Sequence, residues 1–266
     1  KPVRIEVNRQ CLMGNFGAVP KVCADDSSFQ VVFDVVEGAY SSYNLRFDAD
    51  AKAAGFTDVD SLPNNGIVEI EVPESVRPNT YKVRVDFVDP TCGEHPEVLE
   101  FDILYSSAIM AQKFNDVIAL LNSKYNGGYD FVSYQWYKNG QPILDATHSY
   151  LYIGPEETLN INDSYSVSVV RAGETKSIMS CELIPTTHQD QHPYIKQNIA
   201  GVRQNLPIPP SSENGEAIWW SVSGQMIERA PINAYDEYII TPYQQGVYIL
   251  ELRYSDSREL YKVFVK

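Results

Sequence analysis

One group of residues that could bind a metal ion lies near position 190. His188 and His192 flank Asp190, and imidazole and carboxylate groups are ligands that zinc accepts. They fall within the polar run TTHQDQHPYIKQNIA at 186–200, which reads as a linker between folded segments. Histidines in a linker are more often solvated than metal-bound, so we expect no metal site there.

Two pairs of aspartates place carboxylates two residues apart. Asp48 and Asp50 form one pair, and Asp58 and Asp60 form the other. Carboxylate oxygens at this spacing could bind calcium, but neither pair has the pattern of a defined calcium loop. Solvated acids are the better interpretation, and we predict neither a metal nor a cofactor.

The four cysteines indicate disulfide chemistry more than metal chemistry. Cys11, Cys23, Cys92 and Cys181 show no CxxC spacing and no paired histidine, which argues against a zinc site. Three of them lie in the first third of the chain, where a disulfide would form in an exported protein. We predict the pair Cys23 and Cys92, with Cys11 and Cys181 as buried or free thiols, although four cysteines allow three pairings.

Sequence motifs of known enzymes are absent. The chain contains no G-x-S-x-G elbow, no H-E-x-x-H and no glycine-rich phosphate loop. Ser221 and Ser223 beside Gly224 belong to a turn rather than to a nucleophile elbow. We therefore predict a protein without catalytic residues.

Aromatic side chains are the remaining candidates for ligand contact. Trp219 and Trp220 are adjacent, so strand alternation sends them to opposite faces of a sheet. One should lie in the core, while the other is exposed, packed on a neighbouring domain, or available to stack on a sugar ring. Further candidates for a carbohydrate or partner contact are Tyr40, Tyr43, Tyr134 and Tyr137. We expect most of these to be ordinary surface or interdomain contacts, because tyrosine is common on both sheet faces.

Composition limits the class of protein that must position these residues. The 266 residues are 44% hydrophobic, which indicates a globular chain long enough for two or three domains. Eighteen tyrosines favour strands. The net charge of −14 repels phosphate backbones and argues against nucleic-acid binding. No apolar run approaches the length of a bilayer. Lys1 is not a natural start, so we expect the chain to begin after a removed export segment or at an artificial boundary.

Residues 1–105 are predicted to form a β-sandwich domain. Turn clusters separate its apolar-alternating segments, and no long amphipathic helix lies between them. Ala49 to Ala54 is expected to form only a short helical turn. The predicted strands are 3–7, 29–35, 67–72, 81–87 and 98–103.

Residues 106–185 are predicted to form a second sandwich around the stretch Tyr125 to Ile143. Phe131 to Trp136 alternates as a strand, and Lys138-Asn139-Gly140 follows as a hairpin turn because Asn-Gly accepts positive φ angles. Trp136 is the expected core residue of this domain. Met110 to Leu121 fits both a helical stripe and a strand face, and we predict a strand.

A repeated tyrosine links three parts of the chain. Tyr81, Tyr165 and Tyr248 each follow a turn, open an alternating apolar run, and occur at intervals of 84 and 83 residues. Immunoglobulin domains carry D-x-Y-x-C at this point, with the tyrosine bonded back to the backbone. Here Asp163, Tyr165 and Val167 occupy those places, so the usual inter-sheet disulfide is missing. We predict Tyr81, Tyr165 and Tyr248 as core residues of three tandem immunoglobulin-like β-sandwich domains.

The third of these domains is predicted at 201–266, after a linker at 186–200. Its expected strands are 217–222, 226–227, 238–240, 246–253 and 260–265. Ser223-Gly224-Gln225 is the expected turn between the first two.

Two parts of the chain resemble known families. QKFNDVIALLN with YNGGYDFVSYQWYKNGQPI and SYLYIG resembles a module of surface and exported proteins of Bacteroidetes bacteria, and KVCADDSSFQVVFDVVEGAYSSYNLRF resembles the β-repeats that precede it. WWSVSGQMI, YIITPYQQGVYILEL and YKVFVK resemble, in order, the C-terminal sorting domain of the type IX secretion pathway. The early Asn-Pro signature of that family is replaced here by NLPIPP.

These resemblances imply location and fold. They imply a secreted or outer-membrane surface protein, with secretion or attachment machinery as a partner of the C-terminal domain. Together with the residues above, they predict a non-catalytic protein with a structural or adhesive role and an unknown surface partner or glycan. The alternative is a carbohydrate-binding protein or an accessory region of a surface glycan-processing system.

Overall fold

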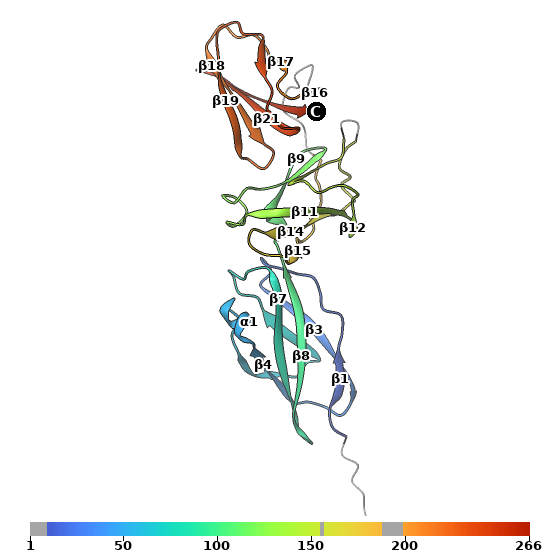
Figure 1. Ribbon diagram of the computed structural model, residues 1–266. Helices are drawn as coiled ribbons and strands as arrows, with labels where there is room; N and C mark the ends of the chain where they lie inside the picture. Colours follow the sequence, from blue (N-terminus) through green and yellow to red (C-terminus); the bar gives the residue numbers. More distant parts are fainter. Residues whose placement is uncertain (1–9, 155–156, 188–198) are drawn as a thin grey trace, which may run out of the picture. The chain divides into compact units, whose positions relative to one another are not determined.

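The computed structural model describes residues 10–154, 157–187 and 199–266. Almost all of its regular structure is β, which confirms the predicted fold class (Figure 1). The described residues contain two short helices, α1 (Ala49–Ala53) and the 3-10 helix η1 (Ser107–Ile109). The chain divides into two compact units: the first unit is 1–106 with 178–181, and the second unit is 107–177 with 182–266. The division into three domains stays a prediction.

The first unit contains two sheets that enclose one core. The three-stranded sheet has the order β1 (Met13–Phe16), β3 (Ser28–Glu37), β6 (Ile67–Glu71). The five-stranded sheet has the order β2 (Val22–Cys23), β8 (Gly93–Leu104), β7 (Asn79–Asp89), β4 (Ser42–Phe47), β5 (Val59–Pro63). The predicted strands from residue 29 onward fall on β3, β6, β7 and β8, whereas the one at 3–7 lies outside the described residues.

Closely packed aromatic rings fill the space between these two sheets. The Phe87 ring lies 4.1 Å from that of Phe33 and 4.7 Å from that of Tyr40, measured between centroids. All three side chains are buried. Rings at such separations add to the burial of their large apolar area, so the aromatic residues of this unit are mainly core residues.

The disulfides differ from the predicted pair. Cys11 bonds Cys92 with a Cα separation of 5.5 Å, and Cys23 bonds Cys181 at 6.0 Å. Cys23 pairs in β2 with Leu104 at the end of β8, whereas Cys92 directly precedes the start of β8. Twelve residues of strand separate those ends by roughly 40 Å, far beyond disulfide reach. The prediction of a Cys23–Cys92 bond and of free Cys11 and Cys181 is therefore wrong.

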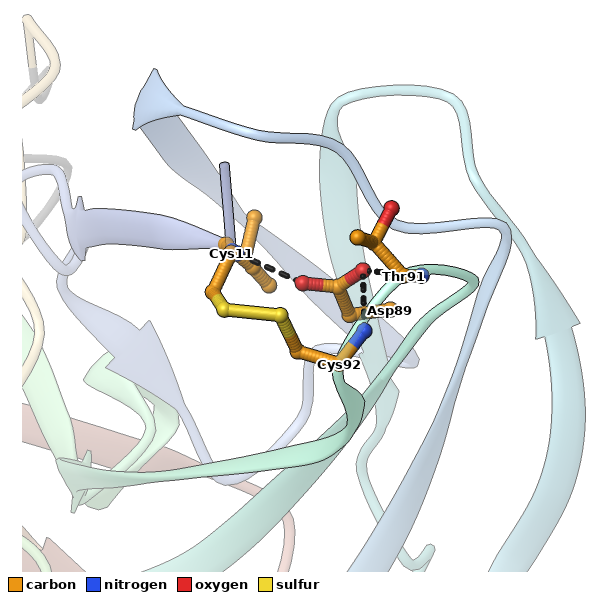
Figure 2. Close-up of a disulfide and its surroundings, with 5 residues drawn as sticks. Cys11, Asp89, Thr91 and Cys92 are labelled. Carbon is orange, nitrogen blue, oxygen red and sulfur yellow. Dashed lines mark hydrogen bonds between the residues drawn. A yellow bond between two sulfur atoms is a disulfide. The ribbon is translucent and has the colours of Figure 1, made fainter. Parts of the chain in front are cut away.

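Asp89 lies beside the Cys11–Cys92 disulfide and bonds to the backbone on both sides of it (Figure 2). Its carboxylate accepts backbone N–H bonds from Leu12 at 2.6 Å, Thr91 at 2.6 Å and Cys92 at 3.1 Å. These bonds favour the ionised form and lower the pKa of Asp89, with the Leu12 bond contributing most. One carboxylate thus joins the turn after β7 to the segment before β1.

The middle part of the second unit has an immunoglobulin-like strand order. One sheet runs β13 (Tyr150–Tyr152), β10 (Val117–Leu120), β9 (Met110–Phe114). The other runs β12 (Gln141–Pro142), β11 (Phe131–Lys138), β14 (Tyr165–Arg171), β15 (Ser177–Met179). When β9 to β15 are lettered A, B, C, C′, E, F and G, these sheets are A-B-E and C′-C-F-G, which is an immunoglobulin-like arrangement. The ambiguous segment 110–121 forms two strands and no helix.

The hairpin that follows β11 uses the residues that its geometry requires. Asn139 and Gly140 have φ angles of 50° and 75°, and Lys138 pairs with Gln141 across a two-residue loop. Positive φ at both central positions defines the primed turn that matches strand twist. Trp136 is fully buried, and its indole N–H donates to the His148 carbonyl at 2.9 Å.

The C-terminal part of the second unit packs a five-stranded sheet against a two-stranded ribbon. The sheet runs β16 (Ile199–Ala200), β22 (Arg258–Val265), β21 (Gly246–Arg253), β18 (Gly215–Ser221), β19 (Met226–Ile232). The ribbon pairs β17 (Asn205–Pro207) with β20 (Tyr238–Ile240). Trp219, Leu206 and Ile239 belong to the core cluster shared by the two layers.

The repeated tyrosines are buried at three similar places but bond differently. The Tyr81 hydroxyl donates to the Arg77 carbonyl at 2.6 Å, and the Tyr248 hydroxyl donates to the Gln244 carbonyl at 2.9 Å. Each bond reaches back four residues, as a tyrosine corner does. Tyr165 is buried too, but no such bond of its hydroxyl occurs within the described stretch 157–187. The sequence pattern predicts a tyrosine corner at Tyr165, but the corners occur at Tyr81 and Tyr248.

Candidate functional site: an exposed tyrosine ribbon

The two adjacent tryptophans have structural roles. Trp219 is almost fully buried and meets the Tyr248 ring edge to face at 6.1 Å. Trp220 points to the other side of the sheet, as alternation requires, and is half-buried. Its indole N–H donates to the carboxylate of the buried Glu251 at 2.8 Å. Trp219 is therefore unavailable to a ligand, which corrects that part of the prediction.

Two of the four tyrosines that the sequence suggests as ligand contacts are buried. Tyr43 is buried, its ring lies 6.2 Å from that of Phe87, and its hydroxyl accepts the Glu69 N–H at 3.1 Å. Burial raises the pKa of Tyr43. Tyr40 is buried as well, whereas Tyr134 and Tyr137 are half-buried. Tyr43 is thus a core residue and not a contact residue.

The aspartates considered for calcium stabilise local structure. Asp48 caps α1 by accepting the Ala51 N–H at 2.8 Å. Asp58 accepts the Phe47 N–H at 2.9 Å and the Lys52 ammonium at 2.9 Å. Asp60 pairs with Arg46. These bonds give three of the four aspartates, Asp48, Asp58 and Asp60, a structural role.

No open metal site is found among the residues that the structure describes. Their single group of three possible ligands is Cys11, Asp89 and Cys92, and its two sulfurs are bonded to each other (Figure 2). A disulfide offers no thiolate to a metal. His188, Asp190 and His192 lie outside the described residues.

Three of the four strongly exposed tyrosines of the described residues lie instead in or beside β20, between positions 235 and 243. Leu206 and Ile239 point inward and are buried, and they face each other in the register. Strand alternation therefore turns Tyr238 and Ile240 outward, opposite Pro207 and Asn205 respectively. The outer face of this short ribbon is largely apolar.

One end of the ribbon is fixed by Thr241 and Arg203. The buried Thr241 hydroxyl donates to the Gly201 carbonyl at 2.6 Å and accepts the Gln204 N–H at 2.9 Å. The Arg203 guanidinium lies 4.1 Å from the centroid of the Tyr243 ring and bonds Glu228 at 3.0 Å. This cation–π contact holds the Tyr243 ring in place.

Four side chains define the surface that we call the tyrosine ribbon. Tyr235 is 72% exposed, Tyr238 53%, Ile240 41% and Tyr243 73%. Tyr235 lies at the far end of the ribbon, where its N–H bonds the Ser211 carbonyl at 2.7 Å. Such rings offer flat apolar faces and hydroxyl tips, which suit stacking on a sugar ring or contact with a protein. The four side chains thus offer the groups that a binding surface needs.

Sequence reasoning missed this surface although a signal was present. The segment 238–240 is correctly predicted as a strand, and alternation about the apolar Ile239 places Tyr238 and Ile240 on one face. What the sequence does not show is that the opposite face of β20 covers the core. The larger indoles at 219–220 directed the prediction to β18 instead.

The described part of the chain has no helix of the length and apolarity that a membrane span requires. No family model and no curated protein matches the sequence.

Solved structures that match this chain at low sequence identity include three proteins. One is the Bacteroides ovatus mixed-linkage glucan utilization protein SGBP-B in complex with a mixed-linkage heptasaccharide, with 10% identity, coverage of 98% of this chain and 71% of that chain, and a TM-score of 0.26. A bacterial ice-binding adhesin shows 10% identity, coverage of 97% and 99%, and a TM-score of 0.27. Immunoglobulin domains 1–4 of Sidekick-1 show 11% identity, coverage of 96% and 74%, and a TM-score of 0.24. At these TM-scores the likeness carries no argument about function, and the fold rests on the strand order described above.

Proposed function

We propose that this chain is an exported, non-catalytic adhesive protein and that the tyrosine ribbon is its contact surface for a glycan. The exposure of Tyr238 and Ile240 on β20, with exposed Tyr235 and Tyr243 in the segments that flank it, carries the proposal. Export is supported by the disulfides, which use all four cysteines. Such bonds persist in oxidising compartments.

The chemistry of the ribbon fits a sugar surface. Aromatic faces pack against the apolar C–H faces of sugar rings, and tyrosine hydroxyls bond to sugar hydroxyls. The net charge of −14 disfavours strongly anionic partners. A neutral or weakly cationic glycan is therefore the expected ligand class.

A glycan array tests this function directly. Tyr238→Ala combined with Tyr243→Ala should abolish binding to the glycans that the unaltered protein retains. Tyr125→Ala serves as the matched control, because Tyr125 is 58% exposed but lies outside the ribbon. The proposal fails if the unaltered protein retains no glycan, or if the double variant binds as well as the control.

We further propose that residues 201–266 act in sorting to the cell surface. Their two-layer β-structure and the resemblance of three of their segments to the type IX sorting domain support this role. In a bacterium with that pathway, deletion of 201–266 should leave the protein in the periplasm, as detected by surface labelling of intact cells. Unchanged surface labelling would contradict the sorting role and would leave the glycan contact untouched.

A further inference from the structure

A concave surface in the second unit shares no residue with the tyrosine ribbon. It is a groove of about 420 Å³ along residues 120–134, closed on one side by the turn between β18 and β19. Its polar lining consists mainly of Asn122, Ser123, Asp130, Ser149, Ser223 and Gln225. The volume lies within the range of small-molecule sites.

Asn126 fixes the loop that forms the floor of this groove. Its buried side-chain amide donates to the carbonyls of Leu121 and Tyr129, both at 2.9 Å, and accepts the Tyr129 N–H at 2.9 Å. Gly127 and Gly128 between them have φ angles of 90° and 88°, which side-chain-bearing residues rarely adopt. The loop is therefore set before any ligand arrives.

Aromatic rings line one side of the groove. Tyr129 and Phe131 stack with centroids 6.0 Å apart at an interplanar angle of 25°. The Tyr134 hydroxyl donates to the Phe131 carbonyl at 2.7 Å. Burial is the main cause that raises the pKa of Tyr134, with the Asp130 charge adding to it. Tyr134 thus stays neutral and in place at physiological pH.

Hydrogen bonds hold the opposite wall against the loop. The Asn122 N–H donates to the Ser223 carbonyl at 3.1 Å. Within the turn, the Ser221 N–H bonds the Gln225 carbonyl at 2.8 Å, and the Gln225 N–H bonds the Ser221 hydroxyl at 3.0 Å. The Gln225 side chain is exposed at the rim. The groove therefore has two fixed walls and a polar edge.

We propose that this groove is a second binding site, specific for a neutral sugar residue. Its lining residues, all of which are described, offer amides, hydroxyls and aromatic rings, but no Lys, Arg or His. Hydroxyl groups find donors and acceptors there, and the apolar side of a pyranose finds rings. The Asp130 carboxylate repels an anionic sugar, and no lining residue carries a positive charge that would offset this repulsion. The groove and the tyrosine ribbon share no residue. Binding at one site can therefore fail while binding at the other persists.

Calorimetric titration of the whole chain tests the groove. The probes are neutral trisaccharides of glucose, mannose, galactose and N-acetylglucosamine, with trigalacturonate as the anionic probe. At least one neutral probe should bind, and trigalacturonate should not. Gln225→Ala should weaken binding about tenfold, which corresponds to the roughly 1.4 kcal/mol of one hydrogen bond. Ser123→Trp, which fills the groove, should abolish binding.

Controls separate the groove from the ribbon and from loss of folding. Val132→Ala is the matched control, because Val132 is exposed beside the groove without lining it. The double variant of Tyr238 and Tyr243 should bind the groove probe as the unaltered protein does. If Ser123→Trp does not fold, Asp130→Lys replaces it and should make trigalacturonate bind. Absence of binding by every neutral probe, equal binding of trigalacturonate, or binding unchanged in the groove variants would overturn the proposal.

Discussion

The two compact units are built from the same kind of β-layers but place their aromatic residues differently. In the described part of the first unit every tyrosine is buried, and no aromatic side chain is strongly exposed. In the second unit Tyr125, Tyr235, Tyr238 and Tyr243 are each more than half exposed. Both disulfides lie in the first unit, whereas the second unit contains no cysteine. The difference supports the proposal that the second unit carries the contact surfaces and that the first unit is a cross-linked scaffold.

The second unit relies on a buried ion pair where the first uses disulfides. The Lys262 ammonium lies 2.5 Å from the Asp116 carboxylate, and the two side chains are 11% and 8% exposed. The Lys262 ammonium also lies 5.0 Å from the centroid of the Phe114 ring. This pair joins the middle and C-terminal parts of the unit beside the apolar cluster of Phe114, Val117 and Val247.

Breaking this ion pair should have the largest effect. Lys262→Met leaves the Asp116 carboxylate buried without a partner, so we expect the free energy of unfolding of the second unit to fall by about 3–5 kcal/mol. Arg229→Met, in the exposed pair with Glu216 of the same unit, should change this free energy far less, because solvent screens an exposed pair. Urea unfolding followed by tryptophan fluorescence measures both, since all three tryptophans lie in the second unit. An effect of Arg229→Met as large as that of Lys262→Met would contradict the reliance of the second unit on its buried pair.

Loss of a disulfide should act on the first unit alone. Cys11→Ser with Cys92→Ser opens a link between residues 81 apart, and we expect about 2–5 kcal/mol of destabilisation. Hydrogen exchange should show faster exchange in β7 and β8 and unchanged exchange in β18 and β21. Faster exchange in both units would show that they do not differ in this way.

The tyrosine corners give a smaller and more local comparison. Tyr81→Phe and Tyr248→Phe each remove one hydroxyl bond to a backbone carbonyl, so each should cost about 1 kcal/mol. Tyr165→Phe removes no such bond and should cost less. Thermal unfolding ranks the three variants by their loss of stability. A larger loss at Tyr165 than at the other two would contradict the assignment of the corners.

The response to acid should reveal the contribution of the Asp89 carboxylate to the first unit. Backbone N–H bonds, above all that from Leu12, lower the pKa of Asp89 in the folded state. Asp89 therefore stabilises the first unit above its unfolded pKa of about 4, and this contribution is lost as the pH falls through the lower folded pKa. Asp89→Asn should lower stability at pH 7 and flatten its decline in acid. Unfolding curves between pH 7 and pH 2 that keep the same slope in both proteins would refute this.

Much of the fold can be predicted from the alternation of apolar residues. Alternation identifies β3, β7, β11 and β21, and the Asn139-Gly140 pair identifies the hairpin after β11. These features depend on neighbouring residues in the sequence, so one sequence suffices to find them.

Features that depend on distant residues could not be predicted in the same way. The partner of Cys23 depends on which end of β8 lies beside β2, and that follows from the sheet order. Likewise, exposure of Tyr238 depends on which layer covers Ile239. The sequence shows that one of Trp219 and Trp220 lies inward, but the role of Trp220 follows from Glu251 on a neighbouring strand.

Chemical labelling of tyrosine tests most directly that the second unit carries the contact surface. In the free protein, iodination should modify Tyr125, Tyr235, Tyr238 and Tyr243 and spare Tyr40, Tyr43 and Tyr81. Addition of a glycan selected on the array should protect Tyr238 and Tyr243, as measured by peptide mass spectrometry, and leave Tyr125 as reactive as before. Labelling of the first-unit tyrosines in the free protein, or glycan protection at Tyr125 without protection of Tyr238 and Tyr243, would contradict the account.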